Sequence, residues 1–230
     1  MRIAFLEKLS LIDYDNKISS VIFTYGCNLR CPFCHNPQLV TGEVSFIKPE
    51  DVLNILKSRK RFVKAVVITG GEPLLQKNLE SFLVQLKELQ FDIKLDTNGT
   101  FPAKLKNIIK KRLVDYIALD LKAKLSPRQY QKAAGVKLDV NLIKEAALAI
   151  RDSGLDYEFR TTAIKELIAP QDIEYNLNVL KPVRRFCLQT FMPHNTLRKR
   201  ARTYTPYSEA EFRFLQKTLE KYTEKGIILR

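Results

Sequence analysis

The sequence predicts an α/β fold in which helices cover a parallel sheet, arranged as a partial (β/α)6 barrel or as an open doubly wound sheet. Two observations lead to this fold class. Short apolar runs alternate with stretches of helical periodicity, and the alternation occurs six times along 230 residues. Six units are too few for a complete eightfold barrel. The chain shows no repeat, low-complexity segment or linker, so residues 1–230 are expected to form a single domain.

Each predicted unit pairs an apolar strand with the helix that follows it. The strands are expected at 18–25, 65–69, 93–96, 114–120, 155–161 and 186–191. The helices are expected at 49–60, 79–90, 103–112, 140–153, 172–180 and 208–225. Gly154 is the predicted C-cap of the fourth helix, and Ser208 with Glu211 forms a capping-box pattern at the start of the last. Segment 121–140 is less regular and predicts a surface loop.

Polar or glycine-rich motifs follow five of the six strands. They are the loop 26–37, Gly70-Gly71-Glu72-Pro73, Asp96-Thr97-Asn98-Gly99, Asp120-Leu121-Lys122 and Phe191-Met192-Pro193-His194. Functional residues of parallel α/β sheets gather at the carboxyl ends of the strands. Selection for a core alone would not place polar groups at so many strand ends. We therefore expect the motifs to form a functional site.

The cysteines indicate a metal site. Cys27, Cys31 and Cys34 lie within eight residues, and Cys187 is distant. This clustering favours a metal site in a reducing compartment over a disulfide framework. Three thiolates can hold three irons of a cubane cluster and leave one iron open to a ligand. The spacing alone also allows a structural zinc with His35 or Cys187 as fourth ligand, although Cys187 more simply reads as a buried strand residue.

The Gly70–Pro73 motif has two readings when taken alone. Its glycines let the backbone approach a ligand closely, and Glu72 is an anionic acceptor for an ammonium group. Pro73 stiffens the exit from the motif. Glycines also occur in ordinary tight turns between a strand and a helix. The motif therefore indicates a ligand-binding site only in combination with the cysteine loop.

The net charge of +14 indicates either a well-solvated surface or an acidic partner. No RNA-binding signature is present, so nucleic-acid binding is not expected from composition. No apolar run approaches the roughly 20 residues that a bilayer span needs, and the first residues lack the long apolar stretch of a signal peptide. A cytoplasmic protein without a membrane partner is expected.

Together, the cysteine loop after the first strand and Gly70-Gly71-Glu72-Pro73 after the second resemble the radical S-adenosylmethionine (radical SAM) superfamily. The resemblance implies a partial (β/α)6 barrel of the radical SAM type, a single core domain with its cluster loop at 26–37. It also implies a [4Fe–4S] cluster on Cys27, Cys31 and Cys34, with SAM chelating the fourth iron. An electron from the cluster would cleave SAM to methionine and a 5′-deoxyadenosyl radical, which abstracts a hydrogen atom.

A narrower resemblance covers nearly the whole chain. It rests on Ser10-Leu11-Ile12-Asp13-Tyr14, the loop CNLRCPFCHNP at 27–37, TGGEPL at 69–74 and DTNG at 96–99. These are similar to activating enzymes of glycyl radical enzymes, above all the anaerobic ribonucleoside-triphosphate reductase activating subgroup. The implied partner is a glycyl radical enzyme, in which a glycine hydrogen is abstracted. Segment 40–49 is too short for an additional cluster module, so a flavodoxin or ferredoxin is expected to deliver electrons.

The same resemblance implies contacts to SAM. Gly71 and Glu72 would bind the methionyl amino group, Lys122 would meet the carboxylate, and Phe33, Cys34 and His35 would line the adenine. The remaining expected cofactor-binding residues are Gly70, Pro73, Asp96, Asn98, Asp120 and His194. A candidate monovalent-cation site consists of Asp96, Thr97 and Asp120, unless the two carboxylates cap turns. His194 reads otherwise as an ordinary surface residue. Stretch 160–166 lacks the glycines that many superfamily members carry there, so no adenine contact is carried over to it.

Two other function classes stay open on the sequence. Radical SAM chemistry could act on a nucleoside, a peptide or RNA instead of a protein glycine. A non-enzymatic zinc or nucleic-acid-binding module would fit the basic charge, but it leaves the motifs at 70–73, 96–99 and 120–122 unexplained.

Overall fold

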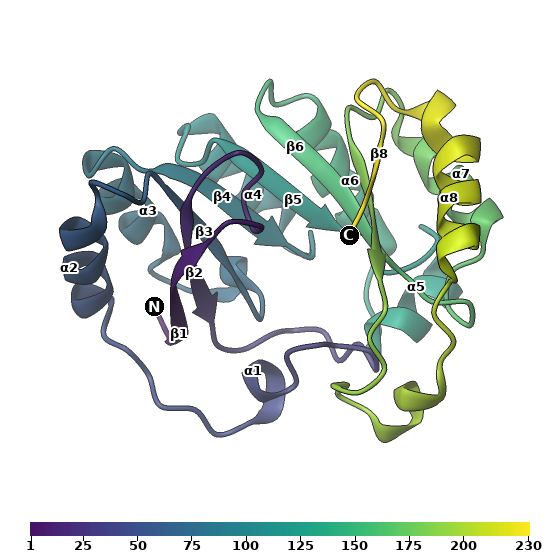
Figure 1. Cartoon of the computed structure of the whole chain (residues 1–230), viewed down its shortest axis with the longest axis horizontal. Coiled ribbons are helices and arrows are strands. Elements are labelled where there is room, and N and C mark those ends of the chain that lie inside the picture. Colours follow the sequence, from purple (N-terminus) through teal and green to yellow (C-terminus); the bar gives the residue numbers. More distant parts are fainter. The chain divides into compact units, whose positions relative to one another are not determined.

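The computed structural model describes residues 1–230, and its elements follow the predicted alternation (Figure 1). The strands are β1 (Ile3–Ser10), β2 (Ser19–Thr24), β3 (Ala65–Gly70), β4 (Asp92–Thr97), β5 (Tyr116–Asp120), β6 (Asp156–Ala163), β7 (Phe186–Thr190) and β8 (Ile227–Leu229). The α-helices are α1 (Gln38–Thr41), α2 (Pro49–Arg59), α3 (Leu79–Glu88), α4 (Pro102–Lys110), α5 (Pro127–Ala134), α6 (Val140–Arg151), α7 (Pro170–Leu180) and α8 (Glu209–Leu219). Short 3₁₀ turns are η1 (Pro73–Leu75), η2 (Lys199–Thr203) and η3 (Glu220–Tyr222).

The sheet has eight strands whose order follows the sequence from β1 to β8. β1 runs antiparallel to β2, whereas β2 with β3, β3 with β4, β6 with β7 and β7 with β8 are parallel pairs. Nearly every position of β2 and β3 is buried, as expected of parallel strands covered on both faces. The predicted α/β class with a mostly parallel sheet is confirmed. None of the helices is both long and apolar enough to span a membrane.

The chain forms two compact units, each built from several segments. Unit 1 consists of Met1–Asn28, Gln38–Thr97 and Ala103–Ala118, and unit 2 of Leu29–Pro37, Asn98–Pro102 and Leu119–Arg230. Unit 1 therefore holds β1 to β4, and unit 2 holds β6 to β8 with α5 to α8. The cysteine loop is divided at the same boundary, with Cys27 in unit 1 and Cys31 and Cys34 in unit 2.

The core of unit 1 contains a buried lysine as well as apolar side chains. Tyr14, Val21 and Tyr116 belong to one buried cluster with Ala65 and Val67. Lys94 on β4 is 2% exposed, and its ammonium donates to the carbonyl of Asp13 at 2.7 Å. The same ammonium lies 5.2 Å from the centre of the Tyr116 ring. A carbonyl and an aromatic face thus compensate part of the cost of burying this charge.

Segment 121–140 corrects the prediction of a surface loop, because it contains helix α5. Pro127 occupies the first turn, and Gly135 ends the helix with a left-handed φ of 69°. Tyr130 is completely buried, so the helix packs into unit 2 instead of lying on the surface. Proline at a helix start and glycine at its end are the signals that were available in the sequence.

Two helix ends also differ from the predictions. Helix α6 ends at Arg151 with Asp152 as its C-cap, and Gly154 takes a left-handed φ of 72° beyond it. The last predicted helix stops at Leu219, and the chain continues through η3 into the unpredicted strand β8. The capping box of Ser208 and Glu211 is confirmed, since each side chain accepts from the other's backbone N–H.

Candidate functional site

The glycine motif after β3 packs directly on the residue that precedes Cys27. In unit 1, the N–H of Gly71 donates to the carbonyl of Thr24 at 2.9 Å, and the N–H of Glu72 donates to that of Gly26 at 2.8 Å. A Cβ at position 71 would lie 2.0 Å from the Gly26 oxygen, so only glycine fits there. The structure thus brings two motifs of the sequence together at neighbouring strand ends.

Glu72 ties the ends of two strands to each other. Its side chain is fully buried, and Oε1 accepts from the N–H of Leu74 at 3.0 Å and from the hydroxyl of Thr97 at 2.8 Å. Thr97 is the last residue of β4. The carboxylate is therefore held in place by its own turn and by the next strand. Its expected contact with an ammonium group stays a prediction.

The turn beyond Glu72 is anchored by two polar side chains that the sequence analysis did not single out. Lys104 on α4 donates to the carbonyls of Leu74 and Gln76. Gln76 in turn donates to the carbonyl of Tyr25 at 2.8 Å and accepts from the N–H of Arg2. These bonds add to those of the glycines and fix the β3 turn against the exit of β2.

In unit 2, the second half of the cysteine loop is attached to α5. The N–H of Cys34 donates to the carbonyl of Cys31 at 3.1 Å, which closes a turn between the two thiols. The N–H of Arg30 donates to the carbonyl of Ala134 at 2.8 Å. A Cβ at Gly135 would lie 2.1 Å from the Arg30 oxygen, so the loop approaches the helix end through a glycine.

The loop is also attached to the segment that follows β7. The backbone N–H of Arg198 donates to the carbonyl of Pro32 at 3.0 Å. The side chain of Asn195 donates to the carbonyl of His35 at 2.7 Å. Pro32 lies between Cys31 and Cys34, so the hydrogen bond from Arg198 reaches the loop between two predicted ligands.

Asp120 at the end of β5 is paired with two cations. Arg160 donates through Nε to Oδ1 at 2.8 Å, and the Lys122 ammonium lies 3.1 Å from Oδ2. Burial alone would raise the pKa of Asp120, but the positive charges of Arg160 and Lys122 outweigh it and hold that pKa well below its ordinary value. Burial alone would lower the pKa of Lys122, but Asp120 and the nearby Cys31 sulfur outweigh it and raise that pKa. Lys122 is therefore a stable cation.

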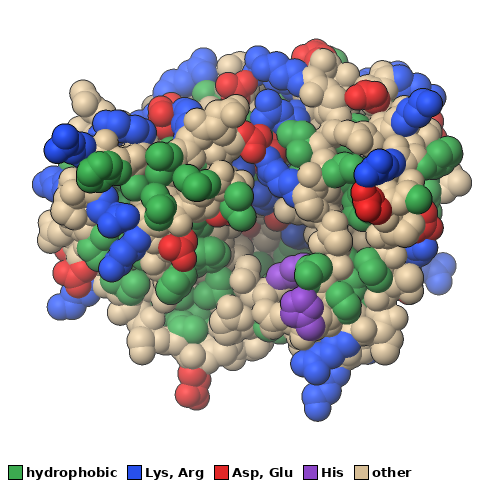
Figure 2. Space-filling model, viewed as in Figure 1, with side chains coloured by type: hydrophobic (Ala, Val, Ile, Leu, Met, Phe, Trp, Pro, Cys, Tyr) green, Lys and Arg blue, Asp and Glu red, His purple; other side chains and the backbone are tan.

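The two histidines lie close to each other in unit 2. Figure 2 shows them side by side in purple. Burial lowers the pKa of His35, and the nearby charges of Lys122 and His194 lower it further. The ring of His35 lies 5.8 Å from that of Phe191, and its Nε2 is buried without a hydrogen-bond partner. A buried ring nitrogen without a hydrogen-bond partner is consistent with a residue that bonds to a ligand. His194 is exposed.

The remaining predicted residues differ in their surroundings. Asn98 accepts from both the N–H and the hydroxyl of Thr100, which is an Asx turn after β4. Phe33 is 3% exposed, and Asp96 is half-buried on β4. Cys187 is completely buried in β7, in agreement with its interpretation as a strand residue.

The cysteines fit the implied iron–sulfur cluster by their chemistry. None of the four forms a disulfide, and Cys27 and Cys34 are partly exposed. No group of three or more His, Cys, Asp or Glu side chains is arranged to hold a metal ion. The assignment of Cys27, Cys31 and Cys34 as ligands therefore rests on their spacing, their thiol chemistry and the glycine-lined loop that carries them.

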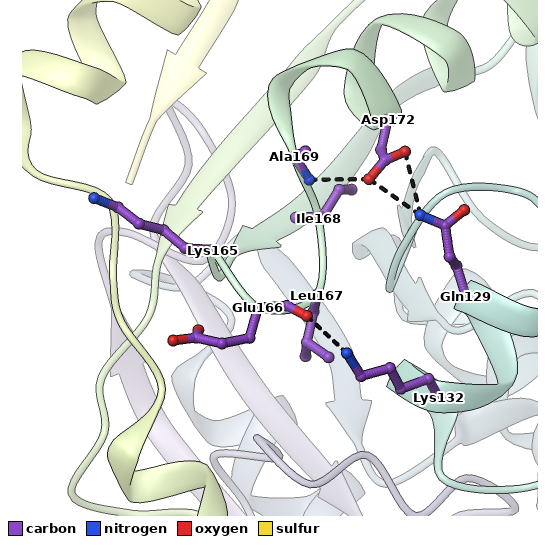
Figure 3. A pocket seen from close by; sticks show the side chains of 8 residues that line it. All are labelled: Gln129, Lys132, Lys165, Glu166, Leu167, Ile168, Ala169 and Asp172. Atoms are coloured by element: carbon purple, nitrogen blue, oxygen red, sulfur yellow. Dashed lines mark hydrogen bonds between the residues drawn. The ribbon is translucent and has the colours of Figure 1, made fainter.

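A small cavity of about 130 Å³ lies on unit 2 beside the loop after β6 (Figure 3). Its charged groups all have hydrogen-bond partners, and those of Lys165 and of the Glu166 carboxylate are Glu211 and Thr205, outside the cavity. Lys132 donates to the carbonyl of Glu166 at 3.0 Å, and Asp172 accepts from the N–H of Ala169 at 3.0 Å and from Gln129. The cavity therefore leaves no lining charge that demands a ligand.

Sequence reasoning missed several residues that shape the site. Arg160, Tyr130 and Arg198 each contact a predicted motif from a distant part of the chain. For Arg160 a signal existed, because Glu158 and Arg160 place two opposite charges on one face of the predicted strand. For Arg198 none existed, since its contact with the cysteine loop is made by the backbone.

Comparisons with known proteins agree with this geometry. A sequence profile described as the radical SAM superfamily matches residues 21–168. A protein of Methanocaldococcus jannaschii named as a glycyl-radical enzyme activating enzyme is 34% identical over 225 residues, which cover 96% of this chain and 92% of the relative. A protein of Pyrococcus horikoshii named as a GTP 3′,8-cyclase is 31% identical over 125 residues, but these cover 54% of this chain and 40% of the relative.

Solved structures show the same fold. The crystal structure of Streptococcus suis SuiB bound to S-adenosylmethionine superposes with a TM-score of 0.71 at 19% sequence identity. The superposition covers 91% of this chain and 49% of SuiB, so the chain spans about half of that protein. The fold class expected from the sequence is therefore confirmed, because the chain shares its architecture with a solved structure.

Proposed function

This chain belongs to the radical SAM superfamily, and from that premise we propose that it is the activating enzyme of a glycyl radical enzyme. The observation that carries the proposal is the end-to-end match to a relative named for that activity, at 34% identity and 92% of its length. The match to the GTP 3′,8-cyclase covers only 40% of that protein, and therefore supports the shared core rather than a shared reaction.

The chain's own residues would bind the cofactors as follows. Cys27, Cys31 and Cys34 would hold a [4Fe–4S] cluster, which with bound SAM supplies a 5′-deoxyadenosyl radical by one-electron reduction. Glu72 would accept the amino group of SAM from its fixed position at the ends of β3 and β4. Lys122, kept protonated beside Asp120, would meet the SAM carboxylate.

The adenine side of the pocket would be formed by the histidine loop. Phe33 is buried, and the unpartnered Nε2 of His35 offers one hydrogen bond to a purine nitrogen or amino group. His194 lies near His35 and would contribute from the segment after β7. Gly70, Pro73 and Asn98 would make further contacts with SAM.

A monovalent cation beside Asp96, Thr97 and Asp120 stays a prediction. In unit 2 both oxygens of Asp120 are already paired with Arg160 and Lys122. Asp120 is thus neutralised by side chains, and it has little need of an added cation.

The proposed partner is an oxygen-sensitive glycyl radical enzyme of the anaerobic ribonucleoside-triphosphate reductase type. Hydrogen abstraction from one backbone glycine would leave a stable radical there. A flavodoxin or ferredoxin would supply the electron, since the four cysteines cannot ligate a second cluster. Residues 1–230 would constitute the radical SAM core domain, with the cluster loop at 26–37.

The test is formation of a glycyl radical in the candidate partner. The reconstituted protein, SAM, a reductant and the partner are mixed without oxygen, and the partner is examined by electron paramagnetic resonance. A glycyl signal that disappears when the target glycine is replaced by alanine supports the proposal. SAM cleavage without that signal, together with modification of a nucleoside, a peptide or RNA, would favour the alternative radical SAM chemistry.

A further inference from the structure

The segment after β7 carries four exposed cations. One precedes η2 and three lie on it: Arg198, Lys199, Arg200 and Arg202. None of the four forms an ion pair with a carboxylate of this chain. We call these residues the basic segment. Because its charges are not neutralised internally, the segment presents a net positive surface to other molecules.

The basic segment is attached to the cysteine loop. The N–H of Arg198 donates to the carbonyl of Pro32 at 3.0 Å, and the hydroxyl of Thr196 donates to the carbonyl of Arg198 at 3.0 Å. Asn195 adds the bond to His35 described above. In Figure 2, Lys and Arg side chains lie next to the purple histidines, where Figure 1 places the segment after β7. The four cations therefore lie beside the loop of Cys31 and Cys34.

We propose that the basic segment is the docking surface for an acidic electron-transfer protein. The inference rests on the proposed function, and it names the place at which the reductant binds. One electron would leave the reduced flavin or iron–sulfur centre of the donor and enter the cluster bound by this chain. No covalent bond forms or breaks in this step. Electron transfer slows steeply with distance, so a donor must dock near the loop that holds the ligands.

Charge complementarity argues for this occupant. Redox partners meet in small, short-lived interfaces, whose formation depends on steering by opposite charge. RNA-binding surfaces combine cations with exposed aromatic side chains for base stacking. The segment Lys199–Thr203 contains no aromatic residue, and the adjacent Tyr204 is half-buried near Phe191. An acidic protein therefore fits the segment better than RNA.

The experiment compares two charge-matched variants of the cluster-loaded protein. The first changes Arg198, Lys199, Arg200 and Arg202 to Gln. The control changes four exposed lysines to Gln, chosen near the N-terminal ends of β7 and β8 and therefore at the other end of these strands from the basic segment: Lys181, Lys217, Lys221 and Lys225. A third variant, R198K/R200K/R202K, keeps the charge of the basic segment. Reduced bacterial flavodoxin is the probe, and stopped-flow absorbance follows cluster reduction at low and physiological salt. Flavin fluorescence titration measures binding independently of activity.

We expect the first variant to lose roughly tenfold or more in the second-order rate and in flavodoxin affinity at low salt, and to lose most of its salt dependence. The control should change by no more than about threefold, and the lysine variant should retain binding. Reduction by dithionite should be equal in all forms. Equal losses in the first variant and the control would overturn the inference, because the net charge of the protein would then explain the loss without a specific docking surface. A first variant with unchanged flavodoxin binding and reduction rate would also overturn it. The readouts do not involve the glycyl radical partner, so they stand even if that function fails.

Discussion

Arg160 on β6 donates through Nε to Oδ1 of Asp120 at 2.8 Å, across 40 residues of sequence. Its side chain is 10% exposed and that of Asp120 is 24% exposed. The pair fixes the carboxylate that also positions Lys122, so a residue outside every predicted motif sets the geometry of the Asp120-Leu121-Lys122 strand end.

Loss of the Arg160 guanidinium should destabilise the fold. In Arg160→Gln, Asp120 retains only Lys122 as a charged partner, and we expect a loss of roughly 2 kcal/mol in the free energy of unfolding, because breaking a largely buried pair leaves an uncompensated charge. Urea denaturation measures the loss. Arg213→Gln is the matched control, since its pair with Glu209 is exposed on α8 and should contribute less than about 0.5 kcal/mol. Similar losses in both variants would contradict this account of Arg160.

The stability contributed by the α8 capping box should depend on pH. Hydrogen bonds from Lys165 and from Ser208 lower the pKa of Glu211 to about 2, from an ordinary value of 4.5. A carboxyl whose pKa is lowered by folding stabilises the native state above its unfolded pKa, and this contribution is lost as pH falls towards the folded pKa. The stability difference between wild type and Glu211→Gln should therefore shrink between pH 6 and pH 3. Circular dichroism melts measure it, with Glu209→Gln as control. A difference that stays constant with pH would rule out this linkage.

The three clustered cysteines, but not Cys187, should be required for the cluster. We expect about four irons per chain after anaerobic reconstitution of the wild type and of Cys187→Ala, because Cys187 is buried in β7. Alanine at Cys27, Cys31 or Cys34 should abolish SAM cleavage. Iron analysis and product chromatography provide the measurements. Loss of iron in Cys187→Ala, with the fold intact, would show that the ligand set is wrong.

Glu72 and Lys122 should each contribute to SAM affinity. Glu72→Gln keeps an acceptor for Thr97, and Lys122→Met keeps the length of the side chain, so both should fold and retain iron. A hydrogen bond to a charged group contributes roughly 1.5–3 kcal/mol, which predicts a tenfold to hundredfold loss of affinity. Lys124→Met is the control, because Lys124 pairs with Asp172 at 3.6 Å. Unchanged affinity in both site variants would remove these two roles.

The sequence predicted the elements that local patterns encode. Apolar runs located six strands, and the capping box at Ser208 located the start of α8. Strand β1 was missed because it is an edge strand with exposed apolar residues such as Phe5 and Leu9, which blur its alternation. Helix α5 was missed although Pro127 and Gly135 mark its ends.

The predicted site was incomplete because several of its contacts are tertiary. The glycine motif could be recognised, but the packing of Gly71 on Gly26 follows from the parallel pairing of β2 and β3. Arg160 reaches Asp120 only in the folded unit 2, across 40 residues of sequence, and the backbone of Arg198 carries no residue-type signal at all. The motifs therefore supplied the predicted ligand-binding residues, and the fold supplied the residues that hold these motifs in place.

The most direct test follows the hydrogen atom itself. A partner glycyl radical enzyme is produced with both α-hydrogens of its glycines replaced by deuterium, and mass spectrometry examines the 5′-deoxyadenosine released during activation. Activation by hydrogen abstraction from glycine predicts one deuterium in that product, and none when the target glycine of the partner is replaced by alanine. Unlabelled 5′-deoxyadenosine from the intact deuterated partner would contradict the proposed function.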